Sequence, residues 1–156
     1  MLPRFGATVQ LALRGHFHLL AAPLEDRAID CALAVNLHGA GGALLGRVGR
    51  VTGEVSAEGV ATERPLAGTV ALRRGAYTRL LLALRFDGDD GAPRALRGYV
   101  EALPAAPLAT VTEVPFSLYD VRADEDDEVG RGVLRFDARG ELGAALRSLR
   151  LRVGAA

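Results

Sequence analysis

Two glutamates and two tyrosines form the best candidate set for acid–base chemistry in this chain. They are Glu101, Glu113, Tyr99 and Tyr119, and all four lie in segments that alternate like β-strands. A Glu side chain that faces a closed interior has a raised pKa, because burial disfavours its charged form, and it can then act as a general base. The alternative is an ordinary outward-facing set of Glu and Tyr beside Arg. No Ser-His-Asp order and no nucleophile elbow is visible.

Histidine and cysteine provide the next candidates. His16 and His18 lie two residues apart on one predicted strand face, as a two-His metal site requires, but no third ligand is evident and His38 is distant in sequence. We therefore expect surface or rim histidines and no metal. Cys31 is the only cysteine, which excludes an intramolecular disulfide. It lies among strand-like apolar residues, and we expect a buried, inert thiol.

Three further segments resemble binding motifs but are predicted to be turns or loops. The glycine-rich residues 39–46 place Leu44 where a dinucleotide fingerprint needs its third glycine, so no cofactor is expected. Asp87, Asp89 and Asp90 could offer ligands to calcium, but they lie between two predicted strands, where Asp-Gly favours a hairpin turn. The acidic residues 124–128 are expected to form a solvated loop.

Composition limits the classes of function. The 156 residues suit one domain, and the 49% hydrophobic content can build a core. The 19 basic residues, all Arg, balance 19 acidic ones, so no overall field favours nucleic acid or an acidic membrane. No apolar run approaches the roughly 18 residues of a membrane helix. Arg14, His16 and His18 interrupt any signal-peptide core, so we expect a cytoplasmic protein without a membrane span.

Period-two alternation of apolar and polar residues recurs along the chain and indicates an all-β fold. Strands are predicted at about 8–20, 29–37, 51–55, 66–72, 77–86, 94–102, 110–118, 129–136 and 149–153. Residues 21–27 and 59–65 are predicted loops. Short helical segments are expected near 44–48 and at 142–149, the second one capped by Asp137. The pattern favours a lipocalin-like antiparallel up-and-down barrel of about eight or nine strands, with a two-sheet β-sandwich as the alternative.

Several short motifs occur in the order of a known β-rich region. They are "RPLAGTVAL" (64–72), "LLLALRFDGDDGAPRALRGYVEAL" (80–103), "TVTEVPFSLYDV" (110–121), "EVGRGVLRFD" (128–137) and "LRSLRLR" (146–152). The chain resembles the small accessory region found beside bacterial GMC-type flavoprotein oxidases related to cholesterol oxidase. The resemblance implies an association with lipid or sterol chemistry. It brings no catalytic residues, and the chain has no FAD-binding sequence.

These observations predict a non-enzymatic binding or accessory module for a hydrophobic ligand such as a lipid, a fatty acyl chain or a sterol. Its lining is predicted to comprise Leu82, Leu84, Phe86, Val100, Val114, Phe116, Leu134 and Phe136. One alternative is a cofactor-independent cyclase or isomerase that uses the Glu and Tyr set on a lipophilic substrate. Another is a domain that docks on a partner oxidoreductase, such as a GMC-type flavoprotein or another lipid-metabolising enzyme, with Arg147, Arg150 and Arg152 as anchors.

Overall fold

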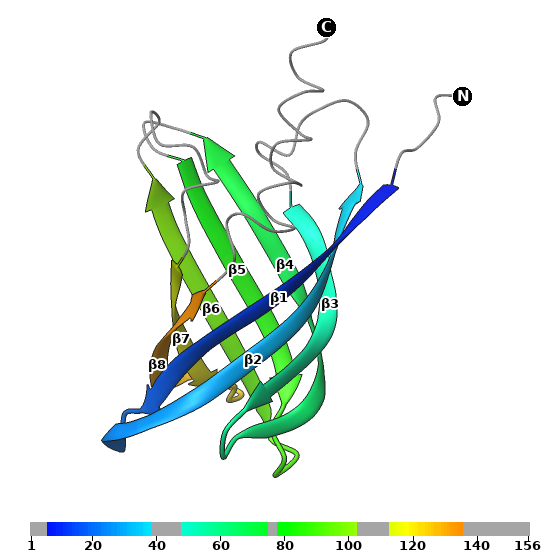
Figure 1. The fold of residues 1–156 in the computed structure, drawn as a ribbon. Coiled ribbons are helices and arrows are strands. Elements are labelled where there is room, and N and C mark those ends of the chain that lie inside the picture. The colour runs from blue at the N-terminus through cyan, green and yellow to red at the C-terminus, as the bar shows by residue number, and fades with distance from the viewer. Residues whose placement is uncertain (1–5, 39–47, 75–77, 103–112, 136–156) are drawn as a thin grey trace, which may run out of the picture.

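Eight antiparallel strands form a closed barrel in the computed structural model, which describes residues 6–38, 48–74, 78–102 and 113–135 (Figure 1). The strands are β1 (Gly6–Leu19), β2 (Ala22–His38), β3 (Val48–Ala57), β4 (Ala61–Arg74), β5 (Thr78–Asp87), β6 (Pro93–Ala102), β7 (Glu113–Asp120) and β8 (Asp127–Arg135). Each strand pairs with the next, and β8 pairs back with β1. The predicted lipocalin-like up-and-down barrel is confirmed, and the sandwich alternative is wrong.

Apolar side chains fill the inside of the barrel because one face of every strand points inward. On β5 and β6, for example, Leu84 lies opposite Leu96, and Leu82 lies opposite Gly98. The buried hydrophobic residues other than Ala95 and Val114 form one cluster that draws on all eight strands. Among the residues whose burial is described, no polar or charged residue is buried.

Two predicted loops prove to be strand. Residues 21–27 fall largely in β2, which begins at Ala22, and residues 59–65 fall largely in β4, which begins at Ala61. Irregular pairing breaks the alternation at both places. The single residue His18 on β1 faces residues 23–26 of β2, and the ladder between β3 and β4 shifts beside Glu63, whose φ is 45°. A pattern search with a strict period of two therefore misses both strand beginnings.

Some predictions fall outside the described residues. These are the glycine-rich loop at 39–46, the helix at 142–149 with its cap Asp137, the closing strand at 149–153, residues 44–47 of the first helical segment, Tyr77 of the fifth predicted strand, residues 110–112 of the seventh, and Phe136. Val48, the last residue of the first helical segment, is the first residue of β3. Within the described ranges, no helix has the length and hydropathy to cross a bilayer.

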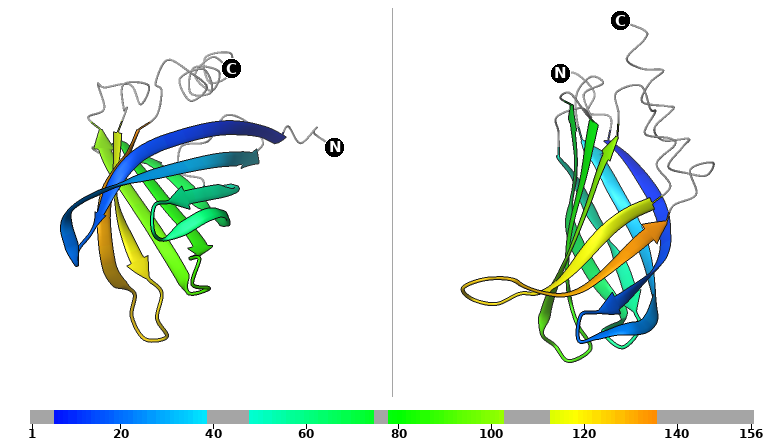
Figure 2. Two further views of the ribbon diagram at one scale, coloured as in Figure 1. Left: turned by 60° about the horizontal axis from the view of Figure 1, so that its bottom comes forward. Right: turned by 90° about the vertical axis from the view of Figure 1, so that its left-hand side faces the viewer.

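The barrel has two different ends, which Figures 1 and 2 show from three directions. We call the end at the bottom of Figure 1 the lower end. It carries the turns that join β1 to β2, β3 to β4, β5 to β6 and β7 to β8. At the opposite, upper end, β1 begins at Gly6 beside His38 of β2, and β5 begins at Thr78 beside Arg74 of β4.

Candidate functional site: the interior of the barrel

The predicted ligand-lining residues lie on the inner surface. Those that the structure describes lie at alternate positions whose side chains point to the buried face of β5, β6, β7 or β8. Leu82, Leu84, Phe86, Val114, Phe116 and Leu134 are buried, and Val100 is half-buried. Burial inside the barrel is confirmed for these six residues but not for Val100, and Phe136 lies outside the described residues. Contact of any of them with a ligand stays a prediction.

The middle of the barrel is a packed core. Leu84, Leu96, Leu118 and Leu134 each expose no more than 1% of their surface. Eight-stranded barrels are just wide enough for their own side chains to fill, or to hold one small ligand. The side chains at this level therefore serve chiefly to stabilise the fold.

Inward-facing apolar residues on β4, β5 and β6 are less buried nearer the upper end. Val70 of β4, Leu80 of β5 and Val100 of β6 are half-buried and continue the inward-facing series of their strands. Leu80 lies directly opposite Val100, and Val70 lies opposite Leu82. We call Val70, Leu80 and Val100 the upper apolar strip. Across three adjacent strands it presents three apolar side chains side by side.

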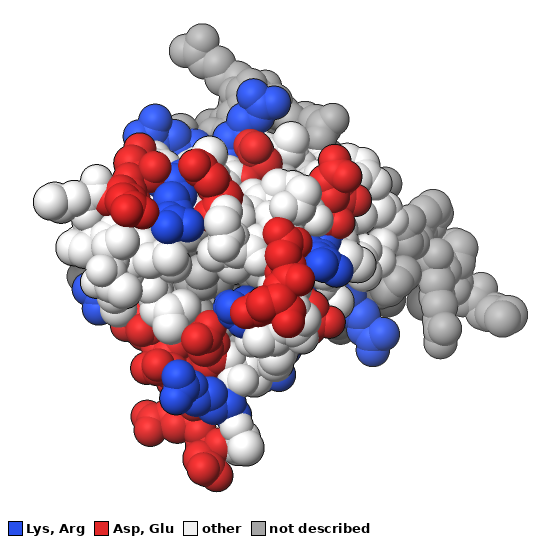
Figure 3. Space-filling model, turned by 90° about the horizontal axis from the view of Figure 1, so that it is seen from below, with Lys and Arg blue, Asp and Glu red and all other residues white. Residues whose placement is uncertain are grey.

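Charged side chains occupy the lower end of the barrel. Arg94 continues the inward series of β6 and is only 15% exposed. Its Nε lies 2.9 Å from Oδ1 of Asp120, and its Nη2 lies 2.9 Å from Oδ2 of Asp90. Figure 3, viewed from below, shows acidic and basic side chains interspersed over this end. Charged side chains that pair with one another therefore lie at the lower end of the barrel, in contrast to the upper apolar strip.

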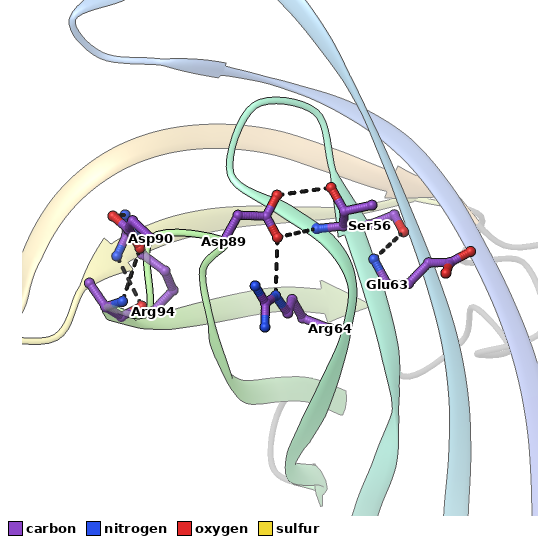
Figure 4. Close-up of polar contacts among 8 residues, drawn as sticks. Ser56, Glu63, Arg64, Asp89, Asp90 and Arg94 are labelled. Atoms are coloured by element: carbon purple, nitrogen blue, oxygen red, sulfur yellow. Dashed lines mark hydrogen bonds and ion pairs between the residues drawn. The ribbon is translucent and has the colours of Figure 1, made fainter.

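Asp89 fixes the turn between β5 and β6 to β4, as Figure 4 shows. Its carboxylate accepts hydrogen bonds from the backbone N–H of Thr62 at 2.9 Å, the Thr62 hydroxyl at 2.8 Å and Nε of Arg64 at 3.0 Å. These bonds lower the pKa of Asp89 below its usual value, the Thr62 bonds contributing most. The predicted hairpin turn is confirmed, and within the described residues no three His, Cys, Asp or Glu side chains are grouped for a metal ion.

The acid–base candidates lie on the outside of the barrel. Because Val100 continues the inner series and Val114 is buried, their neighbours Glu101 and Glu113 face outward. An Oε1 atom of each Glu lies 3.3 Å from Nε of an arginine, Arg79 for Glu101 and Arg135 for Glu113. The cyclase or isomerase alternative requires a carboxylate that points into the barrel, and neither Glu101 nor Glu113 meets this requirement.

The two candidate tyrosines share this outer face. Tyr99 is 45% exposed. The guanidinium carbon of Arg97 lies 4.7 Å from the centre of the Tyr119 ring, a cation–π contact on the outer surface. Neither phenol is placed for proton transfer inside the barrel.

Cys31 is buried on β2 between Leu13 of β1 and Val55 of β3. Burial, with a smaller contribution from the charge of Asp30, raises the pKa of its thiol to about 12. The prediction of a buried thiol is confirmed. His16 is exposed on β1, whereas His38 pairs with Gly6 at the other end of the β1–β2 ladder, so these two histidines lie far apart.

No family model, no curated protein and no solved structure matches this chain. The resemblance to the region beside GMC-type flavoproteins therefore stays a hypothesis drawn from short motifs.

Proposed function

We propose that the barrel is a binding module for a hydrophobic small molecule, which contacts the upper apolar strip. One observation carries the proposal: Val70, Leu80 and Val100, inward-facing toward one end of the barrel, are only half-buried, while at the other end the inward-facing Arg94 pairs with Asp120. Concave apolar surface with few polar groups suits hydrocarbon-rich ligands.

The proposed ligand is a lipid, a fatty acyl compound or a sterol. Among the residues whose burial is described, no polar or charged side chain is buried, and the inward-facing Arg94 and Asp120 already pair with each other, so the inner wall offers a ligand's polar group little to bind. A ligand with a long or broad apolar body meets this constraint. The motif resemblance favours the same class and suggests a GMC-type flavoprotein or another lipid-metabolising enzyme as a partner.

A pair of adjacent leucines provides a matched test. Leu80 faces the interior, and Leu81 faces outward, while both are half-buried on β5. Titration with the fluorescent apolar probe N-phenyl-1-naphthylamine should show saturable binding to the wild-type protein. Leu80→Glu should weaken binding at least tenfold, about 1.4 kcal/mol, and Leu81→Glu should leave it nearly unchanged.

Two outcomes would contradict the proposal. In one, the folded wild-type protein fails to bind the probe. In the other, both substitutions weaken binding equally, which places the probe elsewhere on the surface. Thermal melts of both variants would verify that each one is folded.

The two alternative functions have less support. A cyclase or isomerase that relies on Glu101, Glu113, Tyr99 or Tyr119 requires at least one inward-facing group, and all four lie on the outer face. The docking surface suggested by Arg147, Arg150 and Arg152 falls outside the described residues. That alternative rests on the sequence alone.

A further inference from the structure

The hairpin between β1 and β2 has an unusual sequence for a tight turn. Residues 20–24 read Leu-Ala-Ala-Pro-Leu, without the Gly, Asn or Asp that normally satisfies a hairpin turn. The turn between β5 and β6 follows the usual chemistry, with Asp and Gly at 87–91. A run of exposed apolar residues is unfavourable in water unless it has a function.

The apolar run is strongly exposed. Leu24 is 98% exposed and Leu20 is 42% exposed, and where burial is described only Tyr99 joins them as an exposed large hydrophobic residue. Leu24 belongs to the irregular part of β2, residues 23–26, which faces the single residue His18. Bulges of this kind redirect side chains. In the left view of Figure 2 the hairpin stands away from the barrel.

The base of this hairpin is held in place. Arg27 donates hydrogen bonds from Nη1 to the carbonyl oxygen of Glu58 at 3.2 Å and from Nη2 to Oε2 of Glu25 at 3.0 Å. The backbone N–H of Ala28 donates to Oε2 of Glu58 at 3.0 Å. A Cβ atom at Gly59 would lie 2.1 Å from Nη1 of Arg27, so the glycine leaves room for this side chain. The exposed leucine is thus presented on a supported base, which lowers the entropy lost on binding.

We propose that residues 20–26 form a docking element that inserts Leu24 into an apolar pocket of a protein partner, and that basic side chains border this pocket. The charge argument rests chiefly on Asp26, which is exposed two residues after Leu24, because Oε2 of the neighbouring Glu25 already pairs with Nη2 of Arg27. A carboxylate beside the anchor favours a basic rim and disfavours an anionic lipid surface. Because the hairpin lies at the lower end, docking leaves the upper apolar strip free.

The test uses a photo-crosslinking amino acid at position 20 in the full chain, expressed in the cells that naturally make the protein. The crosslinked partner is identified, purified and titrated against the wild type and three variants. Leu24→Ser should weaken binding at least tenfold. Asp26→Arg should weaken it severalfold and reduce its dependence on salt, whereas the control Tyr99→Ser should change little. Each variant alters an exposed side chain, so thermal melts should match the wild type.

Three results would overturn the proposal. The crosslinker could yield no protein adduct, or the purified partner could bind Leu24→Ser as tightly as the wild type. Alternatively, the wild-type protein could sediment with phosphatidylcholine vesicles, lose this binding in Leu24→Ser and form no protein adduct. That third result would assign the hairpin to a lipid surface.

Discussion

Arg94 and Asp120 form an ion pair at the lower end of the barrel, with Nε of Arg94 2.9 Å from Oδ1 of Asp120. The two side chains are only 15% and 32% exposed, because each lies on the inward side of its strand. They are also a cross-strand pair of β6 and β7. The contact therefore ties two adjacent strands together at the point where the apolar interior ends.

This pair should contribute more to stability than an exposed one. Asp120→Asn should lower the free energy of unfolding by about 1.5 kcal/mol, since it weakens a charge-assisted hydrogen bond with little access to water. Asp30→Asn, which alters the exposed pair of Arg14 and Asp30, should change it by less than about 0.5 kcal/mol. Urea unfolding of both variants tests the difference, and equal effects would show that the partial burial of Arg94 is unimportant.

Because side chains fill the middle of the barrel, truncation of one of them should leave a cavity and lower the free energy of unfolding considerably. Leu96 is fully buried, so Leu96→Ala should lower the free energy of unfolding by about 2–4 kcal/mol. Leu24→Ala, at a fully exposed site, serves as the control and should stay within about 0.5 kcal/mol. Chemical denaturation measures both. A loss below about 1 kcal/mol for Leu96→Ala would indicate an interior that is hollow at this level.

Gly68 is required because two backbones approach closely. A Cβ atom at this position would lie 1.9 Å from the carbonyl oxygen of Ala83 on β5, a contact that cannot form without moving a strand. Gly68→Ala should therefore cost about 3 kcal/mol or more in unfolding free energy. At Gly91 a Cβ atom meets nothing within 4 Å, but φ is +80°, so Gly91→Ala should cost only about 1 kcal/mol. A reversed order in thermal melts would contradict this account.

The amount of structure that the sequence predicts depends on how regular each strand is. From Leu80 to Phe86 the inner face is apolar without interruption, and the predicted and observed strands agree closely. At residues 21–27 and 59–65 the pairing is irregular, so alternation fails although the chain continues as a strand. A local sequence pattern cannot reveal a bulge, because pairing with the neighbouring strand decides how many residues lie opposite one residue of that strand.

The sequence pattern also predicts only part of the candidate site. Alternation identifies Leu82, Leu84 and Phe86 as buried, but it does not show how deep each lies or that side chains fill the middle of the barrel. Leu80 and Val70 carry the same signal, but the predicted lining does not include them. The inward position of Arg94 could have been found, since it lies two residues before Leu96 in the same series.

The lowered pKa values of Asp89 and Asp90 predict that the folded protein loses stability in acid. Hydrogen bonds lower the pKa of both groups from an ordinary value of 3.8, chiefly those from Thr62 for Asp89 and from the backbone N–H of Ala92 for Asp90. A carboxyl with a lowered folded-state pKa adds stability above its unfolded value and loses it as the pH falls through the folded one. The melting temperature should thus decrease as the pH falls through about 3.8 and below.

Substitution of Asp89 separates its contribution to the pH dependence of the melting temperature from the effect of acid on all other groups. Asp89→Asn should lower the melting temperature at neutral pH and should make its decrease in acid shallower. Asp26→Asn, on the exposed hairpin, provides the control and should retain the wild-type slope. If Asp89→Asn also retains the wild-type slope, the hydrogen bonds to Thr62 do not couple protonation to folding.

The buried position of Cys31 predicts that its thiol reacts slowly in the folded protein. Because burial raises the pKa of Cys31 to about 12, almost no thiolate forms at pH 8, and the reagent 5,5′-dithiobis(2-nitrobenzoate) also lacks access to the sulfur. The folded protein should react many times more slowly than the protein in guanidinium chloride. Equal rates in the two conditions would contradict the buried position of Cys31.

The central claim is that the barrel carries a hydrophobic molecule at its upper apolar strip, and native mass spectrometry of freshly purified protein tests it most directly. The account predicts an added mass on the wild type that organic extraction recovers as a lipid, a fatty acyl compound or a sterol. It also predicts that Leu80→Glu lacks this mass and that Leu81→Glu retains it. A folded wild type that carries no ligand, and that takes up none when incubated with such lipids, would contradict the claim.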